Sequence, residues 1–459
     1  MGTILFLLAA GIAADVQVAE DRMLVVDGQR TFVLGLYEYP KEKAALKQAA
    51  DAGVNLMYVH STEELDALQA LGMKGWVNTG YDLDLSVDRE AREAALKAKA
   101  DQFAAHPAMM VWEVPDEALW NVWYAAQEWR FNYQAKQQRE AIAAITDEAQ
   151  KTAMQAQFDD AQRTMREGLY VEGEAKADEL SKTLGLPETQ PAHVINTAAD
   201  RMVVMAEGMK AGYAALKQLD PKHPIWMNHA PRNSIPQLAM FAQAADAVGC
   251  DIYPMPDWGT GHSDLGDRSR TSVGAYTRRM QESAPGKPVF MVLQGFGWAD
   301  LDKNADEATK KRERRPTLAE TRYMAYDTIV NGARGILYWG TAFIEKDSQL
   351  WADVLKVLRE LADLQPVLSA PEAAIALEIN YAETWGSVDR GVRVLPKQAA
   401  DGLWLIVVNE WQDPLHCTLS GVPDGTYTDK DSGKAFVAAG GKVTFTVGSY
   451  GTGVLKHTP

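Results

Sequence analysis

Eight short apolar segments, each closed by turn residues, limit most strongly the fold that this chain can adopt. Between them lie longer amphipathic segments whose apolar residues recur at helical spacing. Strands that alternate with helices predict a parallel sheet, and eight repeats of the unit predict a closed α/β barrel, the (β/α)8 or TIM barrel. The predicted strands are residues 32–39, 54–60, 73–78, 108–112, 224–229, 247–253, 287–294 and 334–339.

The alternation is interrupted after the fourth predicted strand. Residues 121–182 are rich in Ala, Gln, Glu, Lys and Arg, a composition that favours long helices. We therefore expect a helical hairpin inserted over residues 119–190. The regular barrel helix should follow it over residues 192–218.

Two further regions flank the barrel, which we place at residues 15–366. Residues 4–10 are apolar and residues 11–14 are small, which predicts a signal peptide over residues 1–14 and a secreted or periplasmic protein. Beyond two proline breaks, short strands and turns over residues 372–459 predict an antiparallel β-sandwich.

The charge balance excludes several classes of partner. The 459-residue chain has a net charge of −16, whereas nucleic acids and anionic membranes need clustered cations, so we expect neither as a partner, and no membrane contact beyond export. It has no phosphate loop, dinucleotide fingerprint or Gly-x-Ser-x-Gly elbow, which argues against nucleotide enzymes and esterases. His60 and His229 lack further ligands at metal spacing, so we expect no metal or other cofactor. Cys250 and Cys417 fall in different predicted domains and are expected as free thiols.

Polar or aromatic residues close every predicted strand. Because the carboxyl ends of barrel strands meet at one face, these side chains should converge there. Amides and carboxylates can bind hydroxyl groups while aromatic rings stack on sugar rings, so the set suits a polyhydroxylated neutral ligand. The predicted ligand-binding residues are Tyr37, Asn78, Asn228, His229, Tyr253, Tyr338, Trp339 and Trp298.

Six segments carry a more specific resemblance. They are LGLYEYP (34–40), HPAMMVWEVPDE (106–117), HPIWMNHAPRN (223–233), DIYPMP (251–256), KPVFMVLQGFGW (287–298) and GARGILYW (332–339). In these the chain resembles glycoside hydrolases of the retaining, clan-A-type barrel superfamily, especially bacterial members with an Asp-Glu-Pro motif after strand four. The resemblance covers the barrel except the insertion. It implies hydrolysis of an O-glycosidic bond in an oligo- or polysaccharide.

Glu117 matches the acid/base position of that superfamily. A glycosidic oxygen is a poor leaving group, so one carboxyl group must be protonated near neutral pH. We expect the neighbouring Asp116 and an apolar wall from Trp112 to raise the pKa of Glu117. The alternative is that the acid pair only caps the following helix. Glu113 is expected to be a buried supporting acid.

The chain departs from the superfamily at strand seven, where Gln294 replaces the nucleophilic glutamate. Substrate-assisted catalysis would account for this replacement, with an N-acetyl group as the attacking group and Asp116 orienting it. Glu117 would then give the proton, while Gln294 and Tyr253 hold the acetamido oxygen.

Three alternatives to the substrate-assisted scheme are open. The reaction can proceed with inversion, with Glu38 or Asp251 activating water across the barrel mouth. It can proceed with retention, with Asp251 or Glu345 as nucleophile. Finally, the chain can be a catalytically inactive carbohydrate-binding barrel.

The insertion leaves two questions of its own. Its aromatic residues are expected to pack within the hairpin, although Trp120, Trp123 and Trp129 could instead wall a sugar-binding cleft. An apolar surface along residues 121–182 would mark a dimer contact. We therefore expect a monomer or a dimer formed through the insertion.

Overall fold

The eight predicted strands form a closed parallel barrel. The computed structural model describes residues 13–259, 263–383 and 391–459, so nearly all of the predicted signal peptide lies outside the described residues. The barrel closes because β11 pairs with β4, with Leu337 opposite Gly35. The strands are β4 (Val33–Leu36), β5 (Leu56–Tyr58), β6 (Lys74–Asn78), β7 (Met109–Glu113), β8 (Ile225–His229), β9 (Ala247–Ile252), β10 (Phe290–Gln294) and β11 (Gly335–Trp339).

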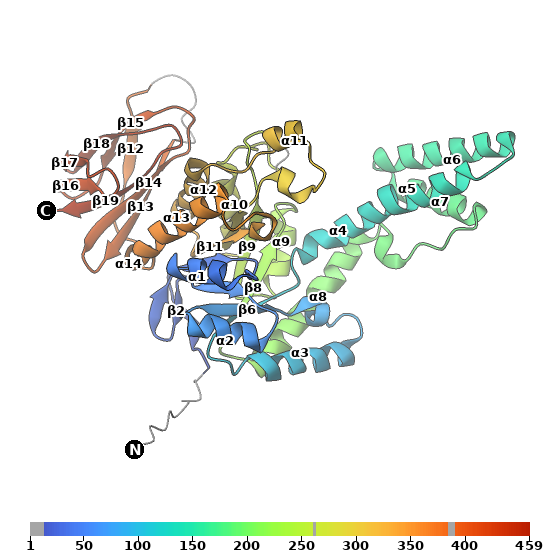
Figure 1. Ribbon diagram of the computed structural model, residues 1–459, viewed down its shortest axis with the longest axis horizontal. Coiled ribbons are helices and arrows are strands. Elements are labelled where there is room, and N and C mark those ends of the chain that lie inside the picture. The colour runs from blue at the N-terminus through green and yellow to red at the C-terminus, as the bar shows by residue number, and fades with distance from the viewer. Residues whose placement is uncertain (1–12, 260–262, 384–390) are drawn as a thin grey trace, which may run out of the picture.

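Helices surround the barrel, as the alternating pattern predicts (Figure 1). Several begin at a side-chain cap, since Ser61 accepts from the Glu64 backbone at 3.3 Å and Thr317 forms a capping box with Glu320. The helices of this layer are α1 (Lys43–Asp51), α2 (Thr62–Ala70), α3 (Arg89–Phe103), α8 (Ala198–Leu219), α9 (Ile235–Ala242), α10 (Ser272–Ser283), α12 (Leu318–Val330) and α13 (Gln349–Asp363). Smaller elements are α11 (Glu307–Arg312), α14 (Gln365–Leu368) and an entry sheet of β1 (Val16–Val18), β2 (Leu24–Val26) and β3 (Gln29–Thr31).

Gly249 marks the tightest approach between two barrel strands. A Cβ atom there would lie 1.9 Å from the Phe290 carbonyl oxygen and 2.7 Å from the indole nitrogen of Trp226. Gly249→Ala is therefore expected to lower the free energy of unfolding by about 1–3 kcal/mol, measured by urea denaturation. Gly266→Ala is the matched control, because its Cβ would meet nothing within 4 Å. Equal stability of the two variants would contradict the prediction.

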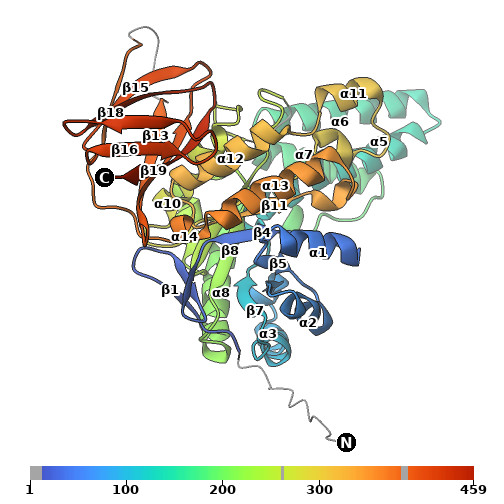
Figure 2. The same ribbon diagram turned by 60° about the vertical axis from the view of Figure 1, so that its left-hand side comes forward.

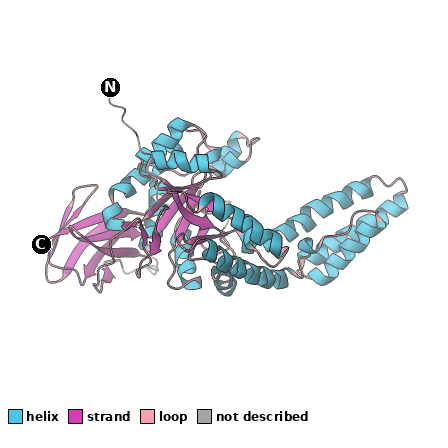
Figure 3. Cartoon of the chain, turned by 90° about the horizontal axis from the view of Figure 1, so that it is seen from below, coloured by secondary structure: helices cyan, strands magenta, loops and turns pink. Residues whose placement is uncertain are grey.

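The insertion after β7 is an elongated helical arm that projects from the barrel (Figures 1 and 3). Its first helical segment consists of α4 (Ala118–Glu128), a π-helical turn (Trp129–Gln134) and α5 (Ala135–Ala143). The expected hairpin follows as α6 (Glu148–Arg166) and α7 (Tyr170–Thr183), which pack on each other, while α6 also packs on α5. The arm thus contains more than a simple hairpin, because α4 and α5 precede the α6–α7 pair.

Buried contacts hold the arm and its base together. Arg130 is fully buried and donates to Asp178 at 2.5 Å. Trp129 stacks on His193 with ring centroids 4.7 Å apart, and the Trp123 indole donates to the Met202 sulfur at 3.2 Å. Trp123 and Trp129 therefore have packing partners within the chain, which favours the packing interpretation over a sugar cleft for these two residues.

The C-terminal region is the predicted β-sandwich (Figure 2). It packs on α12, where the Asn331 side chain donates to Glu410 at 3.1 Å. Cys250 and Cys417 are both buried and free, as predicted. No helix in the described ranges is long and apolar enough to span a membrane. One sheet contains β12 (Glu378–Tyr381), β15 (Leu415–Ser420) and β18 (Lys442–Val447); the other contains β13 (Val392–Ala399), β14 (Gly402–Asn409), β19 (Thr452–Thr458), β16 (Gly425–Asp429) and β17 (Ala435–Ala438).

Candidate active site

Glu113, Asp116, Glu117 and Asp251 form a carboxyl cluster at the carboxyl ends of β7 and β9. The pKa of each is raised, first because burial removes water from the charged form. For Glu113, Glu117 and Asp251, the negative charge of Asp116 raises the pKa further. Such a cluster holds protons at neutral pH that isolated carboxyl groups would have lost.

Glu113 lies at the centre of the barrel, fully buried, as expected of a supporting acid. Its carboxylate accepts from the Tyr37 hydroxyl, from the Trp76 indole at 3.1 Å and from the Asn78 amide at 2.8 Å. Burial and the charge of Asp116 raise the pKa of Glu113 to about 8. Glu113 therefore fixes the positions of two predicted ligand-binding residues, Tyr37 and Asn78.

Asn228 joins the two aspartates of the cluster. It lies on β8, between β7 and β9, and its amide nitrogen donates to Asp116 at 2.9 Å and to Asp251 at 2.5 Å. Tyr253 also interacts with Asp251 and favours its ionised form. These donors favour the ionised forms of both aspartates and hold them on the same side of the barrel mouth.

Glu117 lies at the entrance of the cluster, half-buried. Its backbone has a left-handed conformation (φ 49°), and its N–H donates to the Asn228 carbonyl at 3.2 Å. Burial and Asp116 raise the pKa of Glu117 to about 7, while Arg232 opposes the shift. Although Glu117 directly precedes α4, its carboxylate makes no capping hydrogen bond, which weakens the interpretation of the pair as a helix cap.

The expected contribution of Trp112 to this pKa is wrong. The Trp112 indole donates to Asp220 at 2.7 Å, at the end of α8 in the helix layer. Consecutive residues of a strand point to opposite faces, so Trp112 faces outward where Glu113 faces inward. The aromatic rings inside the barrel at this level are Trp76 and Trp226, which pack edge to face at 5.9 Å beside Glu113. Neither was predicted from the sequence, although their positions two residues before Asn78 and Asn228 give the signal.

Gln294 is fully buried and bound to backbone. Its amide oxygen accepts from the Met255 N–H at 2.8 Å, and its nitrogen donates to the carbonyls of Met255 at 2.9 Å and Phe296 at 3.0 Å. Both of its N–H groups are used, so none is left to hold an acetamido oxygen as the substrate-assisted scheme requires. Gln294 instead fixes the loop after β9.

Two further candidate catalytic carboxylates lie outside the cluster. Glu38 accepts from Gly340 N at 2.5 Å, from Thr341 N at 3.1 Å and from the Thr341 hydroxyl at 2.8 Å. Burial raises the pKa of Glu38. Glu345 is exposed and forms an ion pair with Arg315 at 2.8 Å. Both stabilise the loop after β11, and the structure does not bring them to the other carboxyl groups.

The remaining predicted residues lie either at the barrel mouth or on the outer side of the strands, toward the helix layer. Trp339 stacks on Tyr253 with centroids 5.3 Å apart, and Trp298 joins this aromatic group through Phe296 at 5.3 Å. Tyr338 does not reach the mouth, because it points into the helix layer, where burial and Glu360 raise its pKa.

His229 also departs from its expected place at the mouth. It pairs with Cys250 on the face opposite Asn228, and burial lowers the pKa of its ring to about 4. Its orientation toward the helix layer removes it from the ligand-binding set. Among the described residues, no group of three or more His, Cys, Asp or Glu side chains is arranged to hold a metal ion.

Glu113 makes the free energy of unfolding depend on pH. Its usual pKa of 4.5 becomes about 8 in the folded chain. The stability that its protonated form contributes is therefore fully present below about 4.5 and is lost as pH rises through about 8. Glu113→Gln keeps an acceptor for Trp76 and Asn78 but cannot ionise. We expect urea unfolding of the wild type to weaken between pH ~5.5 and ~8 and Glu113→Gln to flatten that fall, unlike the exposed Glu307→Gln. Parallel slopes for all three proteins would contradict the prediction.

Comparisons with known proteins agree with this architecture. No family model matches the chain, and no curated protein matches it in sequence. Among solved structures, a glycoside hydrolase family 5 protein from Bacteroides vulgatus has a TM-score of 0.53 at 13% identity, covering 96% of this chain and 92% of that one. A GH42 β-galactosidase from G. stearothermophilus gives 0.52 at 11% identity, with coverages of 98% and 100%. A β-galactosidase from Bacillus circulans gives 0.52 at 10%, with 93% and 99%. The chain therefore has the (β/α)8 barrel and trailing β-domain architecture of these hydrolases.

Proposed function

We propose that this protein hydrolyses an O-glycosidic bond, with Glu117 as the general acid. The observation that carries the proposal is the placement of Glu117 at the carboxyl end of β7, beside Asp116, with its pKa raised to about 7. A group with that pKa is partly protonated at neutral pH and can give its proton to the departing oxygen. The glycoside hydrolases of similar structure support the proposal through their shared fold.

Asp251 is the second carboxylate of the proposed mechanism. Gln294 is occupied by backbone hydrogen bonds, and Glu38 and Glu345 are bound in the loop after β11. Asp251 is therefore the candidate left for this role, and Asn228 links it to Asp116 after β7. In its ionised form, which the Asn228 donor favours, Asp251 acts either as the nucleophile or as the base that activates water. The spacing of the two carboxylates with substrate bound sets which of these it is.

A second candidate function is carbohydrate binding without hydrolysis. The observation that favours it is Gln294, an amide at the position where the resembled superfamily has its nucleophile, with all of its polar atoms used by the fold. In that case Trp339 and Tyr253 would stack on a sugar that is not cleaved.

A glycan panel followed by NMR separates these functions. The panel includes β-galactosides, since two of the structural neighbours are β-galactosidases. We expect the wild type to release sugar, and the first anomer to appear shows whether Asp251 attacks the sugar or activates water. Sugar binding in calorimetry without any release would favour the inactive carbohydrate-binding barrel.

A further inference from the structure

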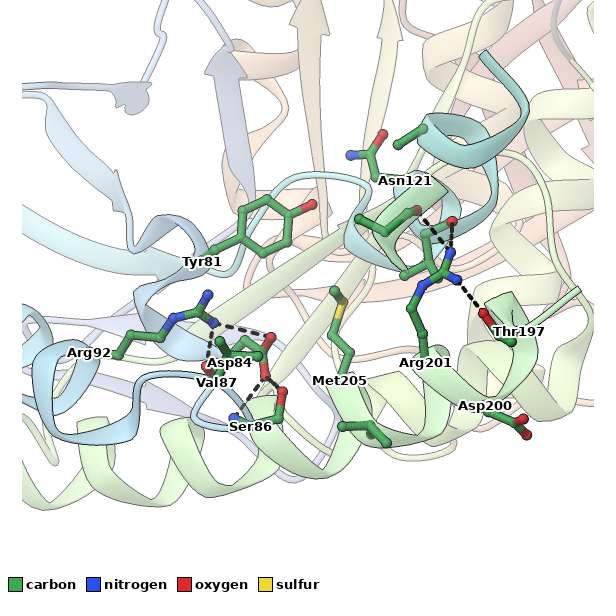
Figure 4. Close-up of a pocket in the computed structure, with 14 residues that line it drawn as sticks. Tyr81, Asp84, Ser86, Val87, Arg92, Asn121, Thr197, Asp200, Arg201 and Met205 are labelled. Carbon is green, nitrogen blue, oxygen red and sulfur yellow. Dashed lines mark hydrogen bonds and ion pairs between the residues drawn. The ribbon is translucent and has the colours of Figure 1, made fainter. Parts of the chain in front are cut away.

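A cavity of about 600 Å³ lies beside the carboxyl cluster, between the loop after β6, the start of α4 and the side of α8 (Figure 4). Its volume is in the range of small-molecule sites. Apolar side chains supply much of its wall, and three of them are strongly exposed: Tyr81 at 42%, Val87 at 50% and Val204 at 56%. Met205 points into its centre (Figure 4).

Most polar side chains of the wall are bound to other parts of the protein. Arg92 pairs with Asp84 at 3.1 Å, and Ser86 donates to Asp84 at 2.5 Å. Arg201 donates to the Val194 carbonyl at 2.5 Å and to the Thr197 hydroxyl at 2.7 Å. With these groups satisfied, the surface offered to a ligand is mainly apolar.

One end of the cavity borders the carboxyl cluster. Asn121 lines the cavity, its side-chain amide donates to the Asp116 carbonyl at 3.0 Å, and its backbone N–H donates to the Glu117 carbonyl at 2.9 Å. The Tyr81 ring extends toward Asn121 from the opposite wall (Figure 4). Burial raises the pKa of Tyr81, and the charges of Asp116 and Glu117 add to this rise. Asn121 thus links the wall of the cavity directly to the backbone of Asp116 and Glu117.

We infer that this cavity binds an apolar aglycone, an alkyl or aryl group attached to the sugar through the bond that is cleaved. The inference rests on the proposed function, because a general acid protonates the leaving group and the aglycone must therefore lie on the side of Glu117. A further sugar would need hydrogen-bond partners that this wall mostly lacks. An apolar group covers the exposed rim and gains free energy in proportion to the area removed from water.

Two neighbouring valines of α8 give a matched test. Val204 lines the cavity, whereas Val203, exposed to 53%, does not. With n-octyl and methyl glycosides of the sugar that the panel identifies, we expect the wild type to favour the octyl compound at least ~10-fold in kcat/KM. Val204→Glu should abolish this preference while leaving the methyl glycoside unaffected, and Val203→Glu should keep it. Equal preference in Val204→Glu and Val203→Glu overturns the inference.

A second measurement separates failure of the inference from failure of the proposed function. Fluorescence titration with 2-naphthol, which has no glycosidic bond, should show binding to the wild type and Val203→Glu that is weakened at least ~10-fold in Val204→Glu. This result supports the apolar site even if no glycoside is cleaved. Unchanged 2-naphthol binding in Val204→Glu overturns the inference whatever the activity. So does a wild-type dimer in sedimentation that becomes monomeric only in Val204→Glu, because a second copy would then cover the cavity.

Discussion

Glu117→Gln is expected to lower kcat/KM by about 100- to 10,000-fold, the range for loss of a positioned general acid. Glutamine preserves the size of the side chain but cannot give a proton to the glycosidic oxygen. The alkaline limb of the wild-type pH profile should lie near the pKa of Glu117, about 7, and should be absent in the variant. The measurement is the initial rate of sugar release across pH on the best substrate of the panel.

A comparison of two leaving groups shows whether the activity lost in Glu117→Gln is that of a general acid. An aryl glycoside with an acidic phenol needs little protonation, so Glu117→Gln should retain far more activity on it than on an alkyl glycoside. Glu345→Gln is the control, because that carboxylate is exposed and paired with Arg315. An equal loss on both substrates would assign Glu117 a structural role instead.

Asp251→Asn is expected to lower kcat at least ~100-fold, the loss typical of removing a catalytic base and a lower limit for a nucleophile. Asparagine can still hydrogen-bond to Asn228 and Tyr253, so the fold and sugar binding should persist. Glu38→Gln is the comparison, because Glu38 is the alternative candidate base and is bound by Gly340 and Thr341. The readout is kcat beside the binding constant for the sugar from calorimetry.

Comparison of the two variants shows whether Asp251 or Glu38 is the second catalytic carboxylate. Full activity in Asp251→Asn together with a large loss in Glu38→Gln would transfer the second catalytic role to the loop after β11. A loss in both that follows a drop in melting temperature would show damage to the fold rather than to the chemistry.

Several features of the site followed from the sequence. The positions of Glu117, Asp116, Asn228 and Asp251 at strand ends predicted that they would meet, because the carboxyl ends of parallel barrel strands share one face. The barrel and the β-sandwich could be predicted for a similar reason: apolar runs, helical periodicity and turn residues are local patterns. The insertion was recognisable as helical, although the run of α4 through a π-helical turn into α5 was not.

Other features depended on contacts between residues far apart in the chain. Gln294 is held by Met255, and Glu38 by Thr341, partners that no local pattern indicates. Trp112 and Tyr338 turn toward the helix layer because side chains alternate along a strand, and a shift of one residue reverses the assignment.

The barrel, the arm, the sandwich and the acidic character of the mouth were therefore predictable, because local periodicity and the residues at strand ends encode them. The tertiary structure was needed to show which carboxylates share the site, since barrel closure and side-chain direction bring Asp251 to Asp116 through Asn228 and direct Glu38 away. It was also needed to reveal the apolar cavity, because the wall joins residues from the β6 loop, α4 and α8 that are far apart in sequence.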